Sequence, residues 1–359
     1  MKKIKMLYIT RKYPPAVGGM ENFSYNLYNN FDSDKVEADI ISLGKSQKNL
    51  VWFLPYAFFR TLFSAHKYDV IFVGDALLSA IGFFTKLLFP KKKVIVNVFG
   101  LDITFKNALY QFYLKLFYGK FDKYISISRE TDRTLHKKGI KNSVVITPGV
   151  NIHQFEGKSA DYNKICKKYN ISENDTVLIT VGRLVKRKGV NWFIRNVMLE
   201  LKDKNIKYLI VGDGEDRENI RNSIDELGLQ DNVKMLGRVD EKVLNAVYTN
   251  ADVFIMPNIH VDGDMEGFGL VAVEASLAGL SVVASGIEGI KDAISDGKNG
   301  WLLESGNVRQ FCDKITDISE NRQKYKETAK IHRQYTIDTY SWKSICSQYT
   351  ELISGMMKD

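Results

Sequence analysis

Short runs of β-branched and aromatic residues alternate along the chain with longer segments in which apolar residues recur at helical spacing. A strand-like run followed by an amphipathic helix is typical of parallel βαβ units. In the first half the pattern predicts a helix at 20–30 among strands at 4–9, 36–42, 69–73 and 94–98. In the second half it predicts helices at 191–204 and 270–278 among strands at 176–181, 208–211, 253–256 and 281–284.

Because the alternation starts again in the second half, we expect two doubly wound α/β domains, one at 1–155 and one at 172–340. The polar stretch 151–175 has no strong strand pattern and is the predicted linker. The segment 341–357 is predicted to be a helix that packs back on the N-terminal domain. Its apolar and aromatic residues fall on one helical face: Trp342, Ile345, Tyr349, Ile353 and Met356.

Composition adds a size estimate and one asymmetry. The chain has 359 residues, 45% of them hydrophobic and 26% charged, which suits two domains of about 150 residues. This excludes a disordered chain and a disulfide-stabilised miniature. Residues 1–160 contain 24 Lys and Arg against 12 Asp and Glu, a balance of +12, whereas the remainder contains 27 against 30, a balance of −3. The basic half is predicted to meet an anionic surface or substrate, with simple solubility as the alternative.

Cysteine spacing and hydropathy favour a cytoplasmic protein. The three cysteines are Cys166, Cys312 and Cys346. Their spacing fits neither a disulfide framework nor a zinc site, so we expect buried thiols in a reducing compartment. Only five residues separate Lys5 from Arg11, too few for the apolar core of a signal peptide. The most apolar regions, 49–63 and 76–90, are shorter than the roughly 20 uninterrupted apolar residues of a membrane span, so no transmembrane helix is expected.

Paired glycines follow the first predicted strand. Gly18 and Gly19 stand where the predicted helix begins, so a ligand could approach the backbone closely there. The free N–H groups and the positive dipole end of a new helix suit a phosphate. The spacing matches neither a dinucleotide fingerprint nor a P-loop, and the pair also fits a purely structural turn.

A basic loop follows the first strand of the second half. Arg183, Lys186, Arg187 and Lys188 place four cations within six residues, at the carboxyl end of a strand where open α/β sheets bind ligands. Such charges repel one another unless an anion neutralises them. A diphosphate is the predicted partner, because a guanidinium binds it bidentately and an ammonium acts as a mobile point charge. The alternative is a solvated basic loop.

Two carboxylates, Glu266 and Glu274, flank a glycine-rich helix start. Eight helical positions span about 12 Å, more than the roughly 5 to 10 Å between the carboxylates of a glycosidase. A nucleophile and an acid acting on one bond are therefore not expected. Glu266 would precede the helix and Glu274 would lie two turns inside it, with Gly267 and Gly269 allowing close backbone approach. This predicts an elongated ligand with hydroxyl groups at both ends and negative charge in the middle.

Taken together, these motifs resemble glycosyltransferase family 4. Their order and spacing agree with the family across most of the chain, in Gly18-Gly19, Val181-Gly-Arg183-Leu with Lys188-Gly189, Val211-Gly-Asp-Gly214, Glu266-Gly-Phe-Gly-Leu with Glu274, and Gly297-Lys-Asn-Gly300. The resemblance implies the GT-B fold, in which two Rossmann-like domains face a central cleft. It further implies a nucleotide-sugar donor held mainly by the C-terminal domain, and transfer with retention at the anomeric carbon without a metal ion or another cofactor.

The resemblance also implies roles for the matching residues. Glu274 would bind the ribose hydroxyls, Glu266 the hydroxyls of the donor sugar, and Arg183 and Lys188 the diphosphate. The other implied donor-binding residues are Gly18, Gly19, Phe268, Gly269 and Leu270 around the phosphates, and Gly212, Gly214, Arg238 and Val239 around the base. Gly267 is also implied to bind the donor, and Pro257 to line the site. Because cations and N–H groups stabilise a departing diphosphate, no protein nucleophile is needed. The leaving phosphate is expected to take the proton of the acceptor hydroxyl.

One motif departs from the family. Many members have His-Gly-x-Asp where this chain has Phe99-Gly-Leu-Asp102. Either a polar contact to the 6-hydroxyl region of the donor is lost, or the local alignment is shifted and Asn97 matters. An apolar Phe99 would accept a 6-deoxy sugar, since no group of the site is left unpaired. Asp102 joins Glu266, Arg183 and Lys188 as a catalytic candidate that orients the acceptor or the sugar, with helix capping as its alternative role.

In the family the N-terminal domain receives the acceptor. Segments 50–63, 82–93 and 109–120 combine bulky apolar residues with cations, as interfacial membrane segments do. Core helices between parallel strands need the same apolar residues, and we expect a mixture of both uses.

The sequence therefore predicts a retaining glycosyltransferase of cell-envelope glycan biosynthesis, such as lipopolysaccharide or exopolysaccharide synthesis. It would use a UDP- or GDP-linked sugar and a lipid-linked or glycan acceptor, and would be peripheral on the inner face of the cytoplasmic membrane. A GT-B-like sugar-nucleotide epimerase, a basic nucleic-acid-binding protein and an inactive binding relative are the alternatives. Nucleic acid is not expected as a partner, because the cations are not part of a known binding module.

Overall fold

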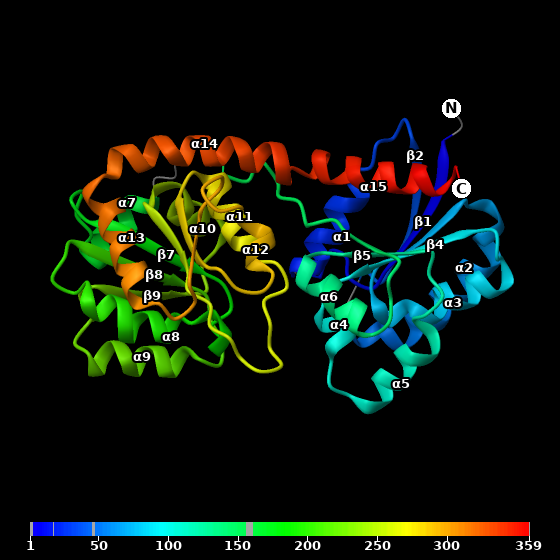
Figure 1. Ribbon diagram of the computed structural model, residues 1–359, viewed down its shortest axis with the longest axis horizontal. Coiled ribbons are helices and arrows are strands. Elements are labelled where there is room, and N and C mark those ends of the chain that lie inside the picture. The colour runs from blue at the N-terminus through cyan, green and yellow to red at the C-terminus, as the bar shows by residue number, and fades with distance from the viewer. Residues whose placement is uncertain (1–2, 17, 45–46, 156–160, 359) are drawn as a thin grey trace. The chain divides into compact units, whose positions relative to one another are not determined.

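The computed structural model describes residues 3–16, 18–44, 47–155 and 161–358. The chain forms two units, an N-terminal unit of Met1–Gly149 with Tyr340–Asp359 and a C-terminal unit of Val150–Thr339. Each unit is built on a six-stranded sheet with helices on its faces (Figure 1). Every strand pair in both sheets is parallel. The predicted α/β class with two Rossmann-like domains is confirmed.

The sheet of the N-terminal unit has the order β2-β1-β3-β4-β5-β6. Its strands are β1 (Ile4–Thr10), β2 (Val36–Ser42), β3 (Val70–Val73), β4 (Lys93–Val98), β5 (Lys123–Ser126) and β6 (Ser143–Val145). Its helices are α1 (Gly19–Asn29), α2 (Leu50–Ser64), α3 (Ser79–Leu88), α4 (Leu101–Thr104), α5 (Ala108–Phe117), α6 (Arg129–Lys137) and α15 (Trp342–Met356), with short 3₁₀ turns η1 (Gln47–Asn49), η2 (Ala65–Lys67) and η3 (Ala76–Leu78).

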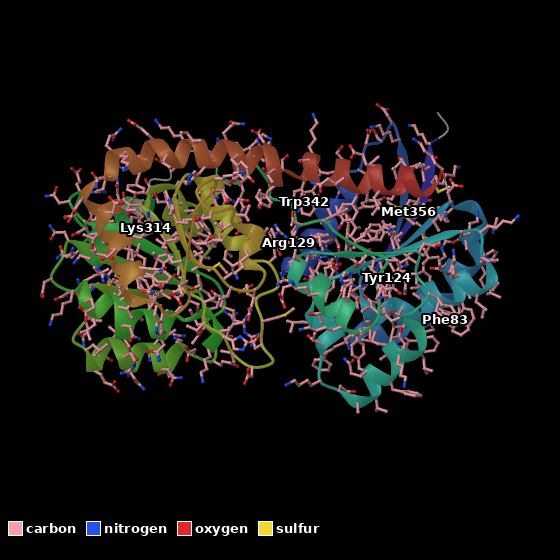
Figure 2. All side chains as sticks on the ribbon, viewed as in Figure 1. Phe83, Tyr124, Arg129, Lys314, Trp342 and Met356 are labelled. Atoms are coloured by element: carbon pink, nitrogen blue, oxygen red, sulfur yellow. The ribbon has the colours of Figure 1, made fainter. Side chains whose placement is uncertain are left out.

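Side chains of successive strand residues enter two separate cores in the N-terminal unit. Leu7 and Ile9 of β1 pack with residues of α2, α3 and α5, whereas Met6 and Tyr8 pack with α1 and α15. Both faces of the sheet are covered in this way, so the central strand β3 is apolar and buried throughout, whereas the edge strand β2 alternates between buried and exposed residues. Figure 2 labels Tyr124 of β5 among these side chains, and Trp342 and Met356 near the two ends of α15.

The sheet of the C-terminal unit has the order β12-β11-β10-β7-β8-β9. Its strands are β7 (Thr176–Val181), β8 (Ile206–Val211), β9 (Val233–Gly237), β10 (Val253–Met256), β11 (Ser281–Ser285) and β12 (Trp301–Leu303). Its helices are α7 (Asp161–Tyr169), α8 (Val190–Phe193), α9 (Arg217–Glu226), α10 (Glu241–Asn250), α11 (Leu270–Ala278), α12 (Ile290–Ala293), α13 (Val308–Glu320) and α14 (Arg322–Tyr340), with a 3₁₀ turn η4 (Lys186–Lys188) and a π-helical stretch η5 (Ile194–Met198).

The boundaries of the units differ from the sequence expectation in one respect. The C-terminal unit starts at Val150 rather than at residue 172, so α7 belongs to it, although 151–175 was expected to be a linker. The last helix lies in the N-terminal unit, where Ile345, Tyr349 and Ile353 are fully buried. Among the described residues, no helix has both the length and the apolar content that a membrane span requires.

Each sheet has one point where the order of its strands reverses. In the C-terminal unit β7 lies between β8 and β10, and in the N-terminal unit β1 lies between β2 and β3. At such a point the loops leave the carboxyl ends of two adjacent strands in opposite directions, and ligands of open α/β sheets bind there. The candidate residues of the sequence follow β7 and β10, on the two sides of this point in the C-terminal unit.

Candidate active site

The loops after β7 and β10 meet through their backbones. Gly189 has a φ of 66°, and a Cβ atom there would overlap the carbonyl oxygen of Pro257. The N–H group of Ile259 donates to the carbonyl oxygen of Arg187 at 2.9 Å. Because only glycine allows this approach, the Lys-Gly sequence at 188–189 fixes the basic loop against the loop that leads to Glu266.

The loop after β8 approaches the same place. Gly212 has a φ of 134°, and a Cβ atom there would overlap the carbonyl oxygen of Gly182. The N–H group of Gly212 donates to the carbonyl oxygen of Gly237 at 2.8 Å, at the end of β9. Arg238 follows, largely exposed, with its Nε 3.7 Å from Asp213 Oδ2. The turns that the resemblance assigns to the base are therefore brought together at one edge of the sheet.

Glu266 is nearly buried and is surrounded by donors. Its Oε2 lies 2.5 Å from Lys188 Nζ and 3.8 Å from Arg187 Nε, and accepts a hydrogen bond from Asn258 Nδ2 at 3.1 Å. Burial alone would raise its pKa, but the charge and hydrogen bond of Lys188, the charge of Arg187 and the hydrogen bond of Asn258 outweigh burial and lower it. Glu266 is therefore a carboxylate near neutral pH, able to accept hydrogen bonds from hydroxyl groups.

Two of the four cations in the basic loop form ion pairs with carboxylates, and the other two are exposed. Lys188 is held by Glu266, and Arg187 Nη1 lies 3.5 Å from Asp264 Oδ2. Arg183 and Lys186 are exposed, and no ion pair joins either of them to another described residue. Carboxylates of the same unit thus neutralise half of the cluster, which the sequence argument for an outside anion did not anticipate.

The backbone of Glu266 is fixed from the loop after β11. Its N–H group donates to Glu288 Oε2 at 2.5 Å, and its carbonyl oxygen accepts from the N–H group of Gly289 at 3.1 Å. A Cβ atom on Gly289 would overlap the carbonyl oxygen of Gly267. Sequence reasoning missed Glu288, because it belongs to no motif and lies 22 residues after its partner.

Helix α11 begins at Leu270, as predicted, directly after the left-handed Gly269. Glu274 lies in the second turn of this helix and faces Tyr248 of α10. Burial raises the pKa of Glu274 to about 7, and the Tyr248 hydroxyl partly offsets the rise. Glu266 and Glu274 therefore differ sharply: one is ionised and held by cations, and the other titrates near neutral pH.

At the switch point of the N-terminal unit, Gly18 and Gly19 stand at the start of α1, as predicted. Glu21 is buried in the first turn and its carboxylate folds back so far that a Cβ atom on Gly18 would overlap it. Lys12 Nζ lies 3.0 Å from Glu21 Oε1. An anionic side chain thus already occupies this helix terminus, where its charge is favourable.

Asp102 connects two loops of the N-terminal unit. Its Oδ1 accepts from the N–H group of Phe99 at 3.0 Å and its Oδ2 from that of Ala76 at 3.4 Å. Gly100 is the N-cap of α4, so Asp102 reaches back from the first turn of that helix. Burial first, and then the neighbouring Asp75, raise its pKa to about 7. These contacts give Asp102 the geometry of a residue that holds the loops after β3 and β4 together.

Asp75, its neighbour, is completely buried. Arg11 Nε lies 3.0 Å from its Oδ2, and its Oδ1 accepts from the N–H group of Leu77 at 2.9 Å.

Phe99 and Asn97 both face the core that contains α1 and α15. The Phe99 ring meets Phe23 edge-on with 5.1 Å between centroids, and Phe23 in turn meets Trp342 at 5.5 Å. Asn97 is fully buried and its Oδ1 accepts from the Tyr349 hydroxyl at 3.0 Å. Both side chains therefore have packing roles in the N-terminal unit.

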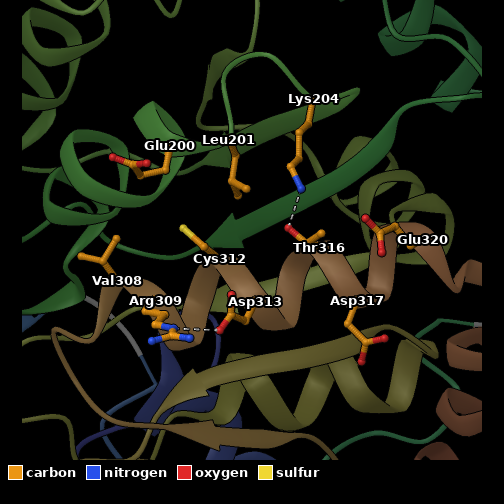
Figure 3. Close-up of a pocket in the computed structure, with 10 residues that line it drawn as sticks. All are labelled: Glu200, Leu201, Lys204, Val308, Arg309, Cys312, Asp313, Thr316, Asp317 and Glu320. Carbon is orange, nitrogen blue, oxygen red and sulfur yellow. Dashed lines mark hydrogen bonds and ion pairs between the residues drawn. The ribbon is translucent and has the colours of Figure 1, made fainter.

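A separate cavity of about 630 Å³ lies between residues 200–204 and α13 in the C-terminal unit (Figure 3). Lys204 Nζ donates to Thr316 Oγ1 at 3.0 Å, and Arg309 Nε lies 3.6 Å from Asp313 Oδ2. None of the site residues predicted from the sequence lines it. The cavity is a groove beside α13, and the residues that line it are distinct from the candidate residues described above.

Comparison with known proteins decides what this arrangement is. The model of "Glycosyltransferase Family 4" matches residues 17–154 and that of "Glycosyl transferases group 1" matches residues 161–335. The chain belongs to glycosyltransferase family 4. It is therefore an enzyme that transfers sugars, and the two family models meet close to the boundary between its two structural units.

Individual relatives agree with this assignment. The uncharacterized glycosyltransferase MJ1069 of Methanocaldococcus jannaschii is 27% identical over 99% of this chain and all of that protein. A GDP-mannose-dependent alpha-(1-6)-phosphatidylinositol monomannoside mannosyltransferase of Mycobacterium tuberculosis is 26% identical over 58% of this chain and 55% of its own length. The crystal structure of Anabaena Alr3699/HepE with UDP and glucose has a TM-score of 0.73 at 18% identity, covering 98% of this chain and all of that one. The GT-B fold of this family 4 glycosyltransferase is thereby confirmed.

Proposed function

We propose that this enzyme transfers a sugar, with retention, from a UDP- or GDP-linked donor to a lipid-linked or glycan acceptor of the cell envelope, without a metal ion. The donor is held by the C-terminal unit and the acceptor is received by the basic N-terminal unit, at the cytoplasmic face of a membrane. The observation that carries the proposal is the nearly buried Glu266 carboxylate, 2.5 Å from Lys188 Nζ, at the point where the strand order of the sheet reverses.

The Lys188–Glu266 pair suggests how the donor is bound. Each partner matches a different part of a nucleotide sugar, the ammonium the diphosphate and the carboxylate the sugar hydroxyls. In the free protein the two groups satisfy each other, so neither is buried unpaired. When the donor enters, its phosphate and hydroxyl groups replace part of this mutual contact, and the exposed Arg183 and Lys186 add further positive charge.

The reaction follows from these charges. The bond between the anomeric carbon and the phosphate oxygen breaks, and the acceptor oxygen bonds to the same face of that carbon. The acceptor hydroxyl gives its proton to the leaving phosphate oxygen, so the products are the glycosylated acceptor and a nucleoside diphosphate. Lys188 and Arg183 stabilise the charge that grows on the diphosphate, an effect worth about 10² to 10³ in rate for each donor group.

The relatives leave both nucleotides open. The M. tuberculosis mannosyltransferase is named as GDP-mannose-dependent and acts on a phosphatidylinositol mannoside, whereas HepE was crystallised with UDP and glucose. The first of these names supports a lipid acceptor and the second a UDP-linked donor.

A thermal-shift panel tests the donor site. We expect UDP or GDP at 100 times its dissociation constant to stabilise the protein by about 2.7 kcal/mol. ADP at the same concentration should stabilise it less. Arg183→Ala and Glu274→Ala should remove most of the shift. Arg309→Ala, which alters another exposed arginine, on α13, is the matched control and should keep it. A native protein that none of these nucleotides stabilises would contradict the proposal, and so would a covalent glycosyl–enzyme trapped at Glu266.

A further inference from the structure

Large apolar side chains are exposed on one side of the N-terminal unit. Helices α2, α3 and α5 cover the same face of its sheet and share one core. Of the exposed large hydrophobic residues in the described part of the chain, most lie on these helices or beside them: Val51, Trp52, Tyr56, Phe59, Phe63, Leu87, Leu88, Leu101, Phe105, Leu109, Phe112 and Leu116. We call this set the aromatic face.

The aromatic face follows from the sequence of its helices. In α2, Trp52, Tyr56, Phe59 and Phe63 recur at helical spacing and form an outer stripe, whereas Phe53 and Ala57 on the inner side are buried. Such a helix has two apolar faces, of which the sheet covers only one. Leu109, Phe112 and Leu116 form the corresponding outer stripe of α5. Ring contacts link the helices, with 5.4 Å between Phe58 and Phe84 and 5.4 Å between Phe83 and Phe117.

Positive charges predominate around this face, although Asp122 forms an ion pair with Lys86 of α3. Helices α2, α3 and α5 contain no Asp or Glu, and the cations on and between them include Arg60, Lys67, Lys91, Lys115 and Lys120. Lys120 Nζ lies over the Phe83 ring at 5.0 Å, and Figure 2 shows Phe83 at the periphery of the unit. Aromatic side chains that alternate with cations, without acidic residues, match the interface of an anionic bilayer.

We propose that the aromatic face docks on an anionic lipid bilayer, with its aromatic stripe inserted at the level of the headgroups. This inference rests on the proposed function, because it gives a lipid-linked acceptor a route to the N-terminal unit. Isolated exposed apolar residues are ordinary, but a contiguous set of this size marks an interaction surface.

Trp52 makes the proposal measurable. Its exposed fraction is 78%, whereas Trp342 is buried and Trp192 and Trp301 are partly buried. With vesicles of phosphatidylglycerol and phosphatidylethanolamine at 50 mM salt, we expect the protein to sediment with the lipid. Its tryptophan fluorescence emission should shift to the blue. Trp52→Phe should still bind while losing most of the shift. The triple variant Trp52→Ser/Phe59→Ser/Phe63→Ser should bind at least tenfold more weakly, and Ile331→Ser, an equally exposed residue on α14, should bind normally.

Three outcomes would overturn the docking proposal: no binding to the anionic vesicles, binding that the triple variant keeps, or concentration-dependent self-association that the triple variant abolishes. Neutral phosphatidylcholine vesicles and 0.5 M salt should each weaken binding. The nucleotide-induced thermal shift is measured without lipid on the same variants. It should be unchanged, so failure of membrane docking and failure of the donor site are told apart.

A second, independent observation concerns Glu288. Its φ is 48°, a left-handed conformation that a glutamate rarely adopts. The same residue accepts the N–H group of Glu266, while the next residue, Gly289, donates to the carbonyl oxygen of Glu266. Both polar backbone groups of Glu266 are thus held by two consecutive residues. The other Glu288 oxygen lies 3.6 Å from His260 Nδ1.

We infer that Glu288 is a positioning residue that fixes Glu266 for the donor sugar. Backbone strain that is kept at a site usually has a functional reason. Here the strained backbone turns the Glu288 carboxylate onto the peptide of Glu266. The inference rests on the sugar-binding role proposed for Glu266.

The test compares a nucleoside diphosphate with its sugar-linked form, UDP with UDP-glucose or GDP with GDP-mannose, whichever binds. Glu288→Gly fits the left-handed backbone and removes the carboxylate. We expect this variant to bind the nucleoside diphosphate with an affinity within twofold of the native value. The additional affinity that the linked sugar provides should fall at least fivefold, as it should in Glu266→Gln. Glu288→Gln keeps an accepting oxygen and should retain the gain.

A Glu288→Gly protein that melts cooperatively and keeps the full gain from the sugar would overturn the positioning role. A native protein that binds the nucleotide but gains nothing from the sugar would overturn the sugar-binding role of Glu266, and the positioning role with it. If the native protein binds neither nucleotide, it is the proposed function that fails.

Discussion

The switch points of the two sheets contain similar residue types in different arrangements. In the N-terminal unit, Asp75 and Asp102 accept hydrogen bonds from the backbone N–H groups of Leu77, Phe99 and Ala76, and Asp75 also pairs with the side chain of Arg11. In the C-terminal unit, Glu266 is held mainly by the side chains of Lys188, Arg187 and Asn258. Backbone partners are part of the fold, whereas side-chain partners can rotate away and be replaced by a ligand.

Under the proposed function, Asp75 and Asp102 hold loops together, whereas Glu266 binds the ligand. Replacing the backbone partners of Asp75 or Asp102 would require the loops after β3 and β4 to change conformation. Lys188 and Glu266 need only rotamer changes, while their loops stay fixed through the close contacts at Gly189 and Gly289. A rigid backbone that carries exchangeable side chains is what preorganised binding requires.

The largest effect should come from the backbone contacts of the C-terminal unit. In Gly212→Ala the new methyl group would collide with the carbonyl oxygen of Gly182 at a φ of 134°. We expect a loss of about 4 kcal/mol or more in the free energy of unfolding, measured by urea denaturation. Gly237→Ala is the matched control, with a φ of 70° but no atom within 4 Å of the new Cβ, and should cost about 1 kcal/mol. Equal losses in the two variants would show that the loops are not held by this contact.

The next effect distinguishes the two carboxylates. Lys188→Met should cost about 3 kcal/mol of unfolding free energy, because it leaves the nearly buried Glu266 without its closest cation. The double variant Lys188→Met/Glu266→Gln should regain much of the lost unfolding free energy. Neither variant should be stabilised by the nucleotide sugar. Asp75→Asn should also unfold more easily, yet keep the nucleotide-induced thermal shift. If Asp75→Asn loses that shift as completely as Lys188→Met does, the distinction between the two switch points is wrong.

The sequence predicted the fold class and several elements, and it placed the candidate residues after two strands of the C-terminal sheet. Strands β2, β7 and β10 and helix α11 have the predicted bounds, because apolar periodicity and glycine positions are local signals. The pairing of Lys188 with Glu266 could not be predicted, since it depends on two loops separated by 78 positions. Glu288 was missed for the same reason.

Exposure was also beyond the reach of the sequence. In α2 the inner Phe53 and the outer Phe59 have the same residue type, and only packing against the sheet shows which one is buried. The sequence therefore indicated segments 50–63, 82–93 and 109–120 as candidates for a membrane interface, but not which of their side chains are exposed.

The smallest effect concerns pH and compares Glu274 with Asp102, whose pKa values are both raised to about 7, in each case first by burial. For an acid, a raised folded-state pKa means that the folded protein holds its proton more tightly than the unfolded chain does. Stability is therefore lost as pH rises from about 4.5 to about 7. For Glu274 this corresponds to at most about 3 kcal/mol, at 1.36 kcal/mol per pKa unit.

At pH 8 the unfolding free energy of Glu274→Gln should consequently exceed that of the native protein by about 1 to 3 kcal/mol. At pH 4 the two proteins should be equally stable. Asp102→Asn should gain less at pH 8, because an amide has one accepting oxygen for the two backbone N–H groups that Asp102 now satisfies. Melting curves of the three proteins at both pH values test this. A larger gain for Asp102→Asn than for Glu274→Gln would mean that the backbone hydrogen bonds of Asp102 do not stabilise its carboxylate. The proposed difference between the two switch points would then be wrong.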